Sequence, residues 1–166
     1  MISLSTYTAI HVAISLIGLA SGFVVLAGLL NGKRLDVWTA VFLVSTLATS
    51  LTGFGFPFQE ILPSHIVGAV SVVLLALAIV ARYRQEMEGG WRAVYVITAV
   101  TSLYLNVFVL IVQLFLKIPM LKDLAPTQSE PPFFIAQGLA LVVFVWLGYQ
   151  ATVRFGDEVR TRMTAA

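Results

Sequence analysis

Two histidines are the side chains in this sequence with the clearest capacity for chemistry. His11 and His65 are the only histidines among the 166 residues, and each lies near the same end of an apolar segment. Each is followed along its helix by small residues, which leave room for a flat, bulky group. Neutral imidazoles can hold iron from both sides. We therefore expect His11 and His65 to be the axial ligands of a haem b that serves electron transfer or sensing.

Other roles for the histidines remain open at this level. His11 can instead hydrogen-bond Ser15 or a backbone carbonyl, and His65 can titrate in water beside Glu60. With Glu60 as a third ligand, the two imidazoles would form a zinc or copper site. The absence of cysteine excludes disulfides, thiol catalysis and iron–sulfur clusters. The sequence contains no plausible carboxylate pair, catalytic triad or phosphate-binding glycine loop, so it does not indicate an enzyme.

A line of polar residues along the segment 91–117 is the second chemical feature. At about 100° per residue, these side chains fall within an arc of roughly 40° on one helix face. In a bilayer they must face the bundle interior or a water-containing cavity. One interpretation is hydrogen bonding between helices, and the other is the polar wall of a small-molecule pocket, with Gln137 of the next helix facing the same wall. The line consists of Tyr95, Ser102, Asn106, Gln113 and Lys117.

The composition places these residues in a membrane protein. The chain is 59% hydrophobic and 11% charged, whereas soluble domains are about half apolar and about a quarter charged. This balance excludes a soluble domain, a disordered chain and a nucleic-acid-binding protein. We predict an all-α, polytopic bundle of five transmembrane helices in one domain, 1–154, followed by a cytoplasmic tail, 155–166. The expected helices are 5–30, 37–55, 63–82, 91–117 and 132–153.

The distribution of positive charge predicts the orientation. Eight of the 10 Lys and Arg residues fall on loops that must share one side, and cytoplasmic loops retain such residues. We therefore expect the N-terminus outside and the C-terminus inside the inner membrane of a bacterium. Gln113, both histidines and the segment 117–132 then gather at the outer end. That segment is long enough for a lid or a partner surface as well as for a connector.

Small residues indicate where the first helix packs. Gly18 and Gly22 form a GxxxG pattern on the same face as His11 and Ser15, and such faces allow close approach of helix backbones in lipid. If the chain is a structural subunit of a larger membrane complex, this face or the segment 117–132 would contact the partner protein.

Two parts of the sequence resemble known proteins. Ile10-His11, Thr52-Gly53-Phe54 and the segment Ser64–Gly68 resemble small bacterial membrane proteins, some of which are bis-histidine cytochromes. That resemblance implies haem ligation by the two histidines, and electron exchange with quinone or a periplasmic protein would follow. The segments Leu105–Val109 and Leu124–Phe133 resemble a family of bacterial integral membrane proteins without an established function.

The remaining hypothesis is a non-enzymatic protein that binds or transports a small molecule.

Overall fold

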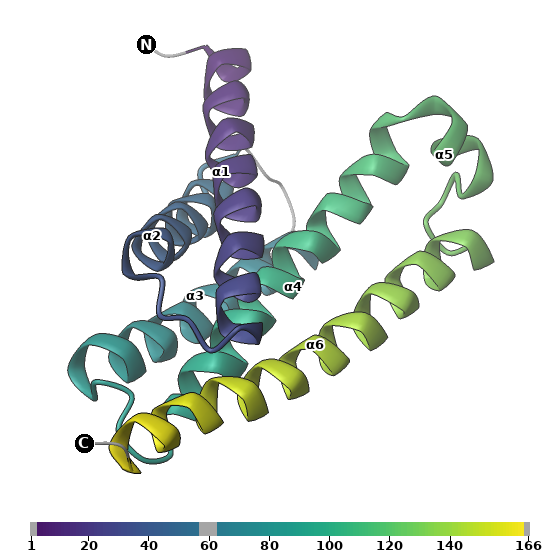
Figure 1. Cartoon of the computed structure of the whole chain (residues 1–166). Helices are drawn as coiled ribbons and strands as arrows, with labels where there is room; N and C mark the ends of the chain where they lie inside the picture. The colour runs from purple at the N-terminus through teal and green to yellow at the C-terminus, as the bar shows by residue number, and fades with distance from the viewer. Residues whose placement is uncertain (1–2, 57–62, 165–166) are drawn as a thin grey trace.

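The computed structural model describes residues 3–56 and 63–164, and the side chains of 3–56 and 65–155. Every regular element in that part of the chain is helical (Figure 1). The elements are α1 (Leu4–Leu30), α2 (Asp36–Gly53), α3 (Pro63–Ile79), the π-helical turn η1 (Val80–Arg84), α4 (Trp91–Lys117), α5 (Pro119–Leu124) and α6 (Pro131–Thr164).

Four segments of the described chain, rather than the five that we predicted, are long and apolar enough to cross a membrane. They are Leu4–Leu30, His65–Arg84, Trp91–Lys117 and Pro131–Phe155. The prediction is wrong for α2, which has only 18 residues. It begins at Asp36, and its many Ser and Thr residues lower its hydropathy. The chain is therefore a helical integral membrane protein with four candidate spans.

Helix α2 lies antiparallel beside α1 over most of the length of α1. Near one end, a Cβ atom at Gly28 would meet Leu35 Cδ1 at 2.7 Å, and near the other His11 Nδ1 lies 2.8 Å from Thr52 Oγ1. Some hydroxyls of α2 bond within the helix, since Ser45 donates to the carbonyl of Val41 at 2.6 Å, whereas the buried Thr49 hydroxyl has no partner among the described residues.

Three other features differ from the sequence prediction. The helix expected at 63–82 ends at Ile79 and continues as the π-helical turn η1. Helix α6 extends to Thr164, so most of the expected tail 155–166 is helical; its polar residues are compatible with a helix that leaves the membrane. The segment 117–132 contains the short helix α5, which starts at Pro119 because proline fits the first helical position.

Gly22 is the point where α1, α2 and α4 meet. A Cβ atom at this residue would lie 2.6 Å from Leu103 Cδ1 of α4 and 2.9 Å from Phe42 Cε2 of α2. One at Gly18 would lie 3.1 Å from Thr46 Oγ1. Both glycines therefore admit neighbouring side chains against the α1 backbone, and the predicted close packing of this face is confirmed.

The helices are packed on one side of Gly22 and separate on the other. All buried residues of α1 lie between Gly18 and Leu29. Toward its N-terminus, α1 diverges from the hairpin formed by α4, α5 and α6 (Figure 1). We call the packed side the closed end, marked by Leu29, Arg82, Tyr95 and Phe155, and the other side the open end, marked by Leu4, Lys117 and Pro131. At the open end a separate small core joins α4, α5 and α6 through Phe115, Ala125 and Phe133.

A methyl group at Gly22 should destabilise the bundle. Gly22→Ala forces Leu103 and Phe42 to move, and overpacking of this kind costs about 1–3 kcal/mol. Gly138→Ala is the matched control, because a Cβ atom there meets nothing within 4 Å and alanine favours a helix over glycine. Thermal unfolding in detergent should show a lower midpoint for Gly22→Ala alone. Equal midpoints for the two variants would contradict the close contact at Gly22.

Candidate functional site

A groove runs along the half of α1 that lies at the open end. It measures about 760 Å³, and Val12 and Leu16 in its wall lie eleven and seven residues before Phe23. These spacings place all three on one helix face, and Phe23 packs against Phe144 of α6, with ring centroids 6.3 Å apart. The groove therefore faces the opening between α1 and the α4–α6 hairpin. The described lining is Leu4, Ser5, Thr8, Ala9, Val12, Ala13 and Leu16.

The polar line on α4 has two parts, one toward the closed end and one toward the open end, and they differ in their surroundings. Toward the closed end its members hold helices together: the hydroxyls of Tyr95 and Thr39 lie 3.3 Å apart, and Asn106 Nδ2 donates to Thr46 Oγ1 at 3.2 Å. Ser102 is buried and donates to its own helix. Tyr95 and Asn106 thus make the contacts between helices that one interpretation predicts, whereas Ser102 bonds within α4. Their role in a pocket stays a prediction.

The outer members of the same line are exposed. Gln113 and Lys117 follow Asn106 on one helix face, beyond the point where α4 and α1 separate, and both side chains are exposed. They therefore border the opening. Gln137 is not with them: it lies on α6, donates to the Phe108 carbonyl at 3.2 Å, and its buried Oε1 has no hydrogen-bond partner among the described residues.

His11 is held by a defined hydrogen bond. The Thr52 hydroxyl donates to the Ala48 carbonyl at 2.7 Å, so its oxygen accepts the Nδ1–H of His11 at 2.8 Å. In a neutral imidazole with this hydrogen bond, Nε2 is the nitrogen without a hydrogen. Phe56 packs edge-on against the same imidazole, with centroids 5.1 Å apart. The structure thus gives His11 a partner on α2, where the sequence suggested Ser15 or a carbonyl.

The space expected for a haem between α1 and α3 contains side chains from α2 and from Phe54, the residue that follows it. Phe54 stacks on His65, with centroids 5.9 Å apart, and its Cζ would lie 3.2 Å from a Cβ at Gly68. Thr46 similarly occupies the small face at Gly18. These side chains occupy the position that a porphyrin between the two helices would need. We therefore derive no chemistry for a haem. The roles of the two histidines as ligands stay predictions.

The alternative metal site stays untested as well. Glu60 lies outside the described residues, and within them no group of three His, Asp or Glu side chains could hold a metal ion.

The segment 117–132 connects α4 to α6 in an ordered way. Gln128, which has a left-handed φ of 59°, donates from Nε2 to the Val112 carbonyl at 3.0 Å. Glu130 accepts from the backbone N–H groups of Thr127 and Ser129 at 3.2 and 3.0 Å. Desolvation raises the pKa of the Glu130 carboxyl, but these bonds and one from the Thr127 hydroxyl outweigh it and leave the pKa lowered.

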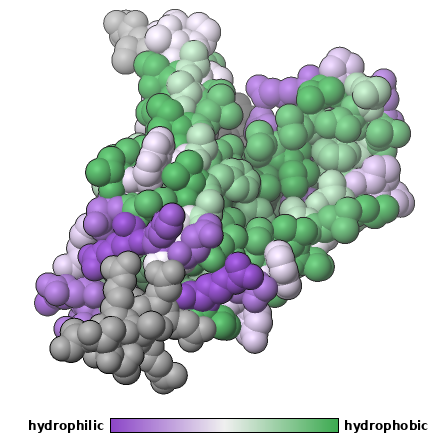
Figure 2. All heavy atoms as spheres, viewed as in Figure 1, coloured by the Kyte–Doolittle hydropathy of each residue, from purple (hydrophilic) through white to green (hydrophobic). Residues whose placement is uncertain are grey.

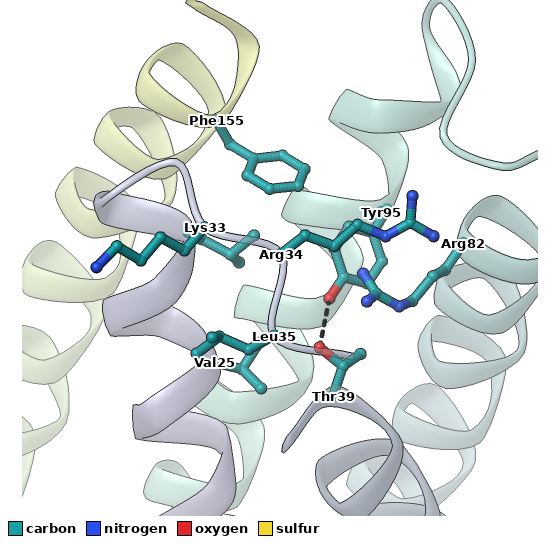
Figure 3. A pocket seen from close by; sticks show the side chains of 9 residues that line it. Val25, Lys33, Arg34, Leu35, Thr39, Arg82, Tyr95 and Phe155 are labelled. Atoms are coloured by element: carbon teal, nitrogen blue, oxygen red, sulfur yellow. Dashed lines mark hydrogen bonds between the residues drawn. The ribbon is translucent and has the colours of Figure 1, made fainter. Parts of the chain in front are cut away.

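A buried arginine at the closed end is the feature that sequence reasoning missed. Arg82 is 1% exposed and lies in η1, with its guanidinium over the ring of Tyr95 at 5.0 Å from the centroid (Figure 3). One of its nitrogens donates to Asp36 Oδ1 at the start of α2. The same side chain therefore joins α2, η1 and α4. In the sequence, Arg82 counts only among the positive charges that predict the orientation, and no local signal separates it from Arg84, two residues on.

Comparison with protein-family models, with curated proteins and with solved structures finds no match to this chain. The two resemblances noted in the sequence therefore identify no family. The chain is shown to be a helical membrane protein with four candidate spans in its described part.

Proposed function

We propose that the protein binds a single-chain amphiphile with an anionic head group in the opening between α1 and α4. The observation that carries this proposal is the apolar groove of about 760 Å³ on α1, which faces an opening bordered by the exposed Gln113 and Lys117. Every described residue that lines the groove belongs to α1, and its other side is open. The groove residues contain no titratable group, which favours binding or transport over catalysis.

The apolar wall of the groove can contact a hydrocarbon chain, but it does not distinguish the chain of a ligand from the tails of bilayer lipids. Lipid tails are as apolar as the leucine side chains that they would contact, so apolar contact gains little free energy in a bilayer. Selectivity must therefore come from the polar side of the opening. Gln113 offers an amide within the membrane-spanning part of α4, where an unpaired polar group is costly. A ligand that pairs with it removes that cost.

Lys117 determines the preferred charge of the head group. It is the last residue of α4, and a lysine at a helix end can lay its methylene chain along apolar surface while its ammonium group reaches the interface. A carboxylate or phosphate head group at that level would pair with the ammonium group. The ligand would thus lie with its head near Lys117 and its tail along Val12 and Leu16.

Filling the groove should block this binding. Val12→Trp places an indole in the groove, and we expect the affinity of the purified protein for a fluorescent long-chain fatty acid to fall by about tenfold or more. Val70→Trp on α3 is the matched control, because Val70 is 46% exposed and Val12 45%. Fluorescence titration in detergent measures both. Equal affinities of the two variants, or no saturable binding by the unmodified protein, would contradict the proposal.

In the same titration, Lys117→Gln tests the head group. An exposed ion pair contributes about 0.2–1 kcal/mol, so the affinity for the fatty acid should fall by up to about fivefold. The affinity for the corresponding long-chain alcohol should not change. An equal loss for both ligands would assign Lys117 a structural role instead.

We also infer that the closed end faces the cytoplasm and that the protein lies in an inner membrane. Lys33, Arg34 and Arg82 line one crevice at that end, as the retention of positive charge predicts, and hydrophilic side chains gather at that end of the molecule (Figure 2). A membrane-impermeant thiol reagent added to intact cells should label Met120→Cys and not Lys33→Cys. The reverse labelling would overturn this orientation.

A further inference from the structure

The guanidinium of Arg82 is buried without full hydrogen bonding. Its Nε atom has no hydrogen-bond partner among the described residues, and one terminal nitrogen donates to the sulfur of Met87, a weak acceptor, at 3.8 Å. A buried guanidinium normally has its N–H groups paired, because an unpaired charged donor carries its full desolvation cost. Arg82 is therefore short of an acceptor.

The charge around Arg82 is also unbalanced. Arg34 Nε donates to Asp36 Oδ1 at 3.1 Å, and Arg82 donates to that same oxygen. Lys33 lines the same crevice. In the part of the chain that the structure describes, the two guanidinium groups thus share one carboxylate, and that carboxylate is 69% exposed. An additional anion at this crevice would be attracted.

The local backbone has the character of a binding site. Arg82 lies in a π-helical turn, a rare conformation that is frequent at functional sites. The turn is followed by Glu86 and Met87, whose φ angles of 49° and 62° are left-handed. Such angles are unfavourable for residues other than glycine. The chain therefore adopts two uncommon conformations in succession where it buries this arginine.

The geometry of the cations favours a phosphate group. Arg34 and Arg82 converge on one point from different elements, and a guanidinium pairs with a phosphate through two parallel hydrogen bonds. The Tyr95 hydroxyl lines the crevice beside them (Figure 3). Trp38 and Trp91, near the first residues of α2 and α4, are both partly exposed, as tryptophans at the head-group level of a bilayer are. The crevice is thus placed where lipid phosphates lie.

We propose that the crevice between Arg34 and Arg82 is a phosphate-binding site, occupied by the phosphate of an anionic lipid head group or by free phosphate. In this structure Arg34 closes the crevice by pairing with Asp36. Arg34 is 52% exposed and free to swing outward. A phosphate then bridges the two guanidinium groups, accepts from Arg82 and takes the place of Asp36 as the partner of Arg34.

The test compares the full-length protein with Arg34→Gln and Arg84→Gln. Both variants lose one positive charge at the closed end, but Arg84 is exposed and does not line the crevice. The binding of phosphatidylglycerol is measured by native mass spectrometry and by thermal unfolding in nanodiscs of phosphatidylcholine with and without phosphatidylglycerol. We expect Arg34→Gln to weaken binding by about tenfold, and Arg84→Gln to leave it nearly unchanged. Arg82→Lys, which keeps the charge but not the paired donors, should weaken it as well.

A parallel titration with inorganic phosphate in detergent distinguishes the two sources. Saturable stabilisation by phosphate that depends on Arg34 indicates free phosphate, and an effect of phosphatidylglycerol alone indicates a lipid head group. Equal losses in Arg34→Gln and Arg84→Gln would overturn the proposal in favour of general attraction to negative charge. So would the absence of any effect of either anion. This site and the amphiphile groove lie at opposite ends of the bundle, so each can fail independently.

Discussion

The contact at Gly22 is the constraint on which the arrangement of this protein depends. The absence of a side chain there lets Phe42 and Leu103 reach the backbone of α1, so that three helices touch at one point. On one side of that point the helices stay packed down to Arg82. On the other side they form two separate arms. Tyr7 donates to the Thr52 carbonyl at 2.6 Å in the first arm, and a core of Phe115, Ala125 and Phe133 holds the second.

This division gives one face of α4 two uses. Near the closed end, its polar side chains bond to α2 and help to hold the bundle in an environment where water cannot satisfy them. Tyr95 and Asn106 serve in this way. Near the open end the same face continues, but α2 and α1 are no longer in reach. Gln113 and Lys117 therefore remain available to a ligand, and the groove on α1 lies across from them.

Much of the fold could be predicted from the sequence because the helices are long and their signals are local. The bounds of α1 and α4 and the packing at Gly18 and Gly22 follow from apolar runs, breaks and small residues. The alignment of the polar line on α4 was equally readable. Periodicity gives the direction of each side chain, however, and not which neighbour stands opposite, so the exposure of Gln113 was not predictable.

The site at the closed end required the tertiary structure. Counting charges treats every arginine near a loop alike, and nothing in that count separates the buried Arg82 from the exposed Arg84. The distinction arises because η1 turns Arg82 toward Tyr95 and Asp36. In the same way, small residues near His65 suggested space for a cofactor, but Phe54, the residue after α2, stacks on the imidazole there. Whether the face of a helix leaves room for a cofactor depends on the segments packed against it as well as on its own sequence.

The separation of the two arms at the open end is the central claim, and one distance tests it. The chain contains no cysteine, so the double variant Val12→Cys, Gln113→Cys can be spin-labelled without background. Both positions lie ten residues beyond the contact of Gly22 with Leu103. Pulsed electron paramagnetic resonance in nanodiscs should give a label separation well beyond the roughly 8–10 Å between the axes of packed helices. A narrow distribution at the packed separation would contradict the opening and the function proposed for it.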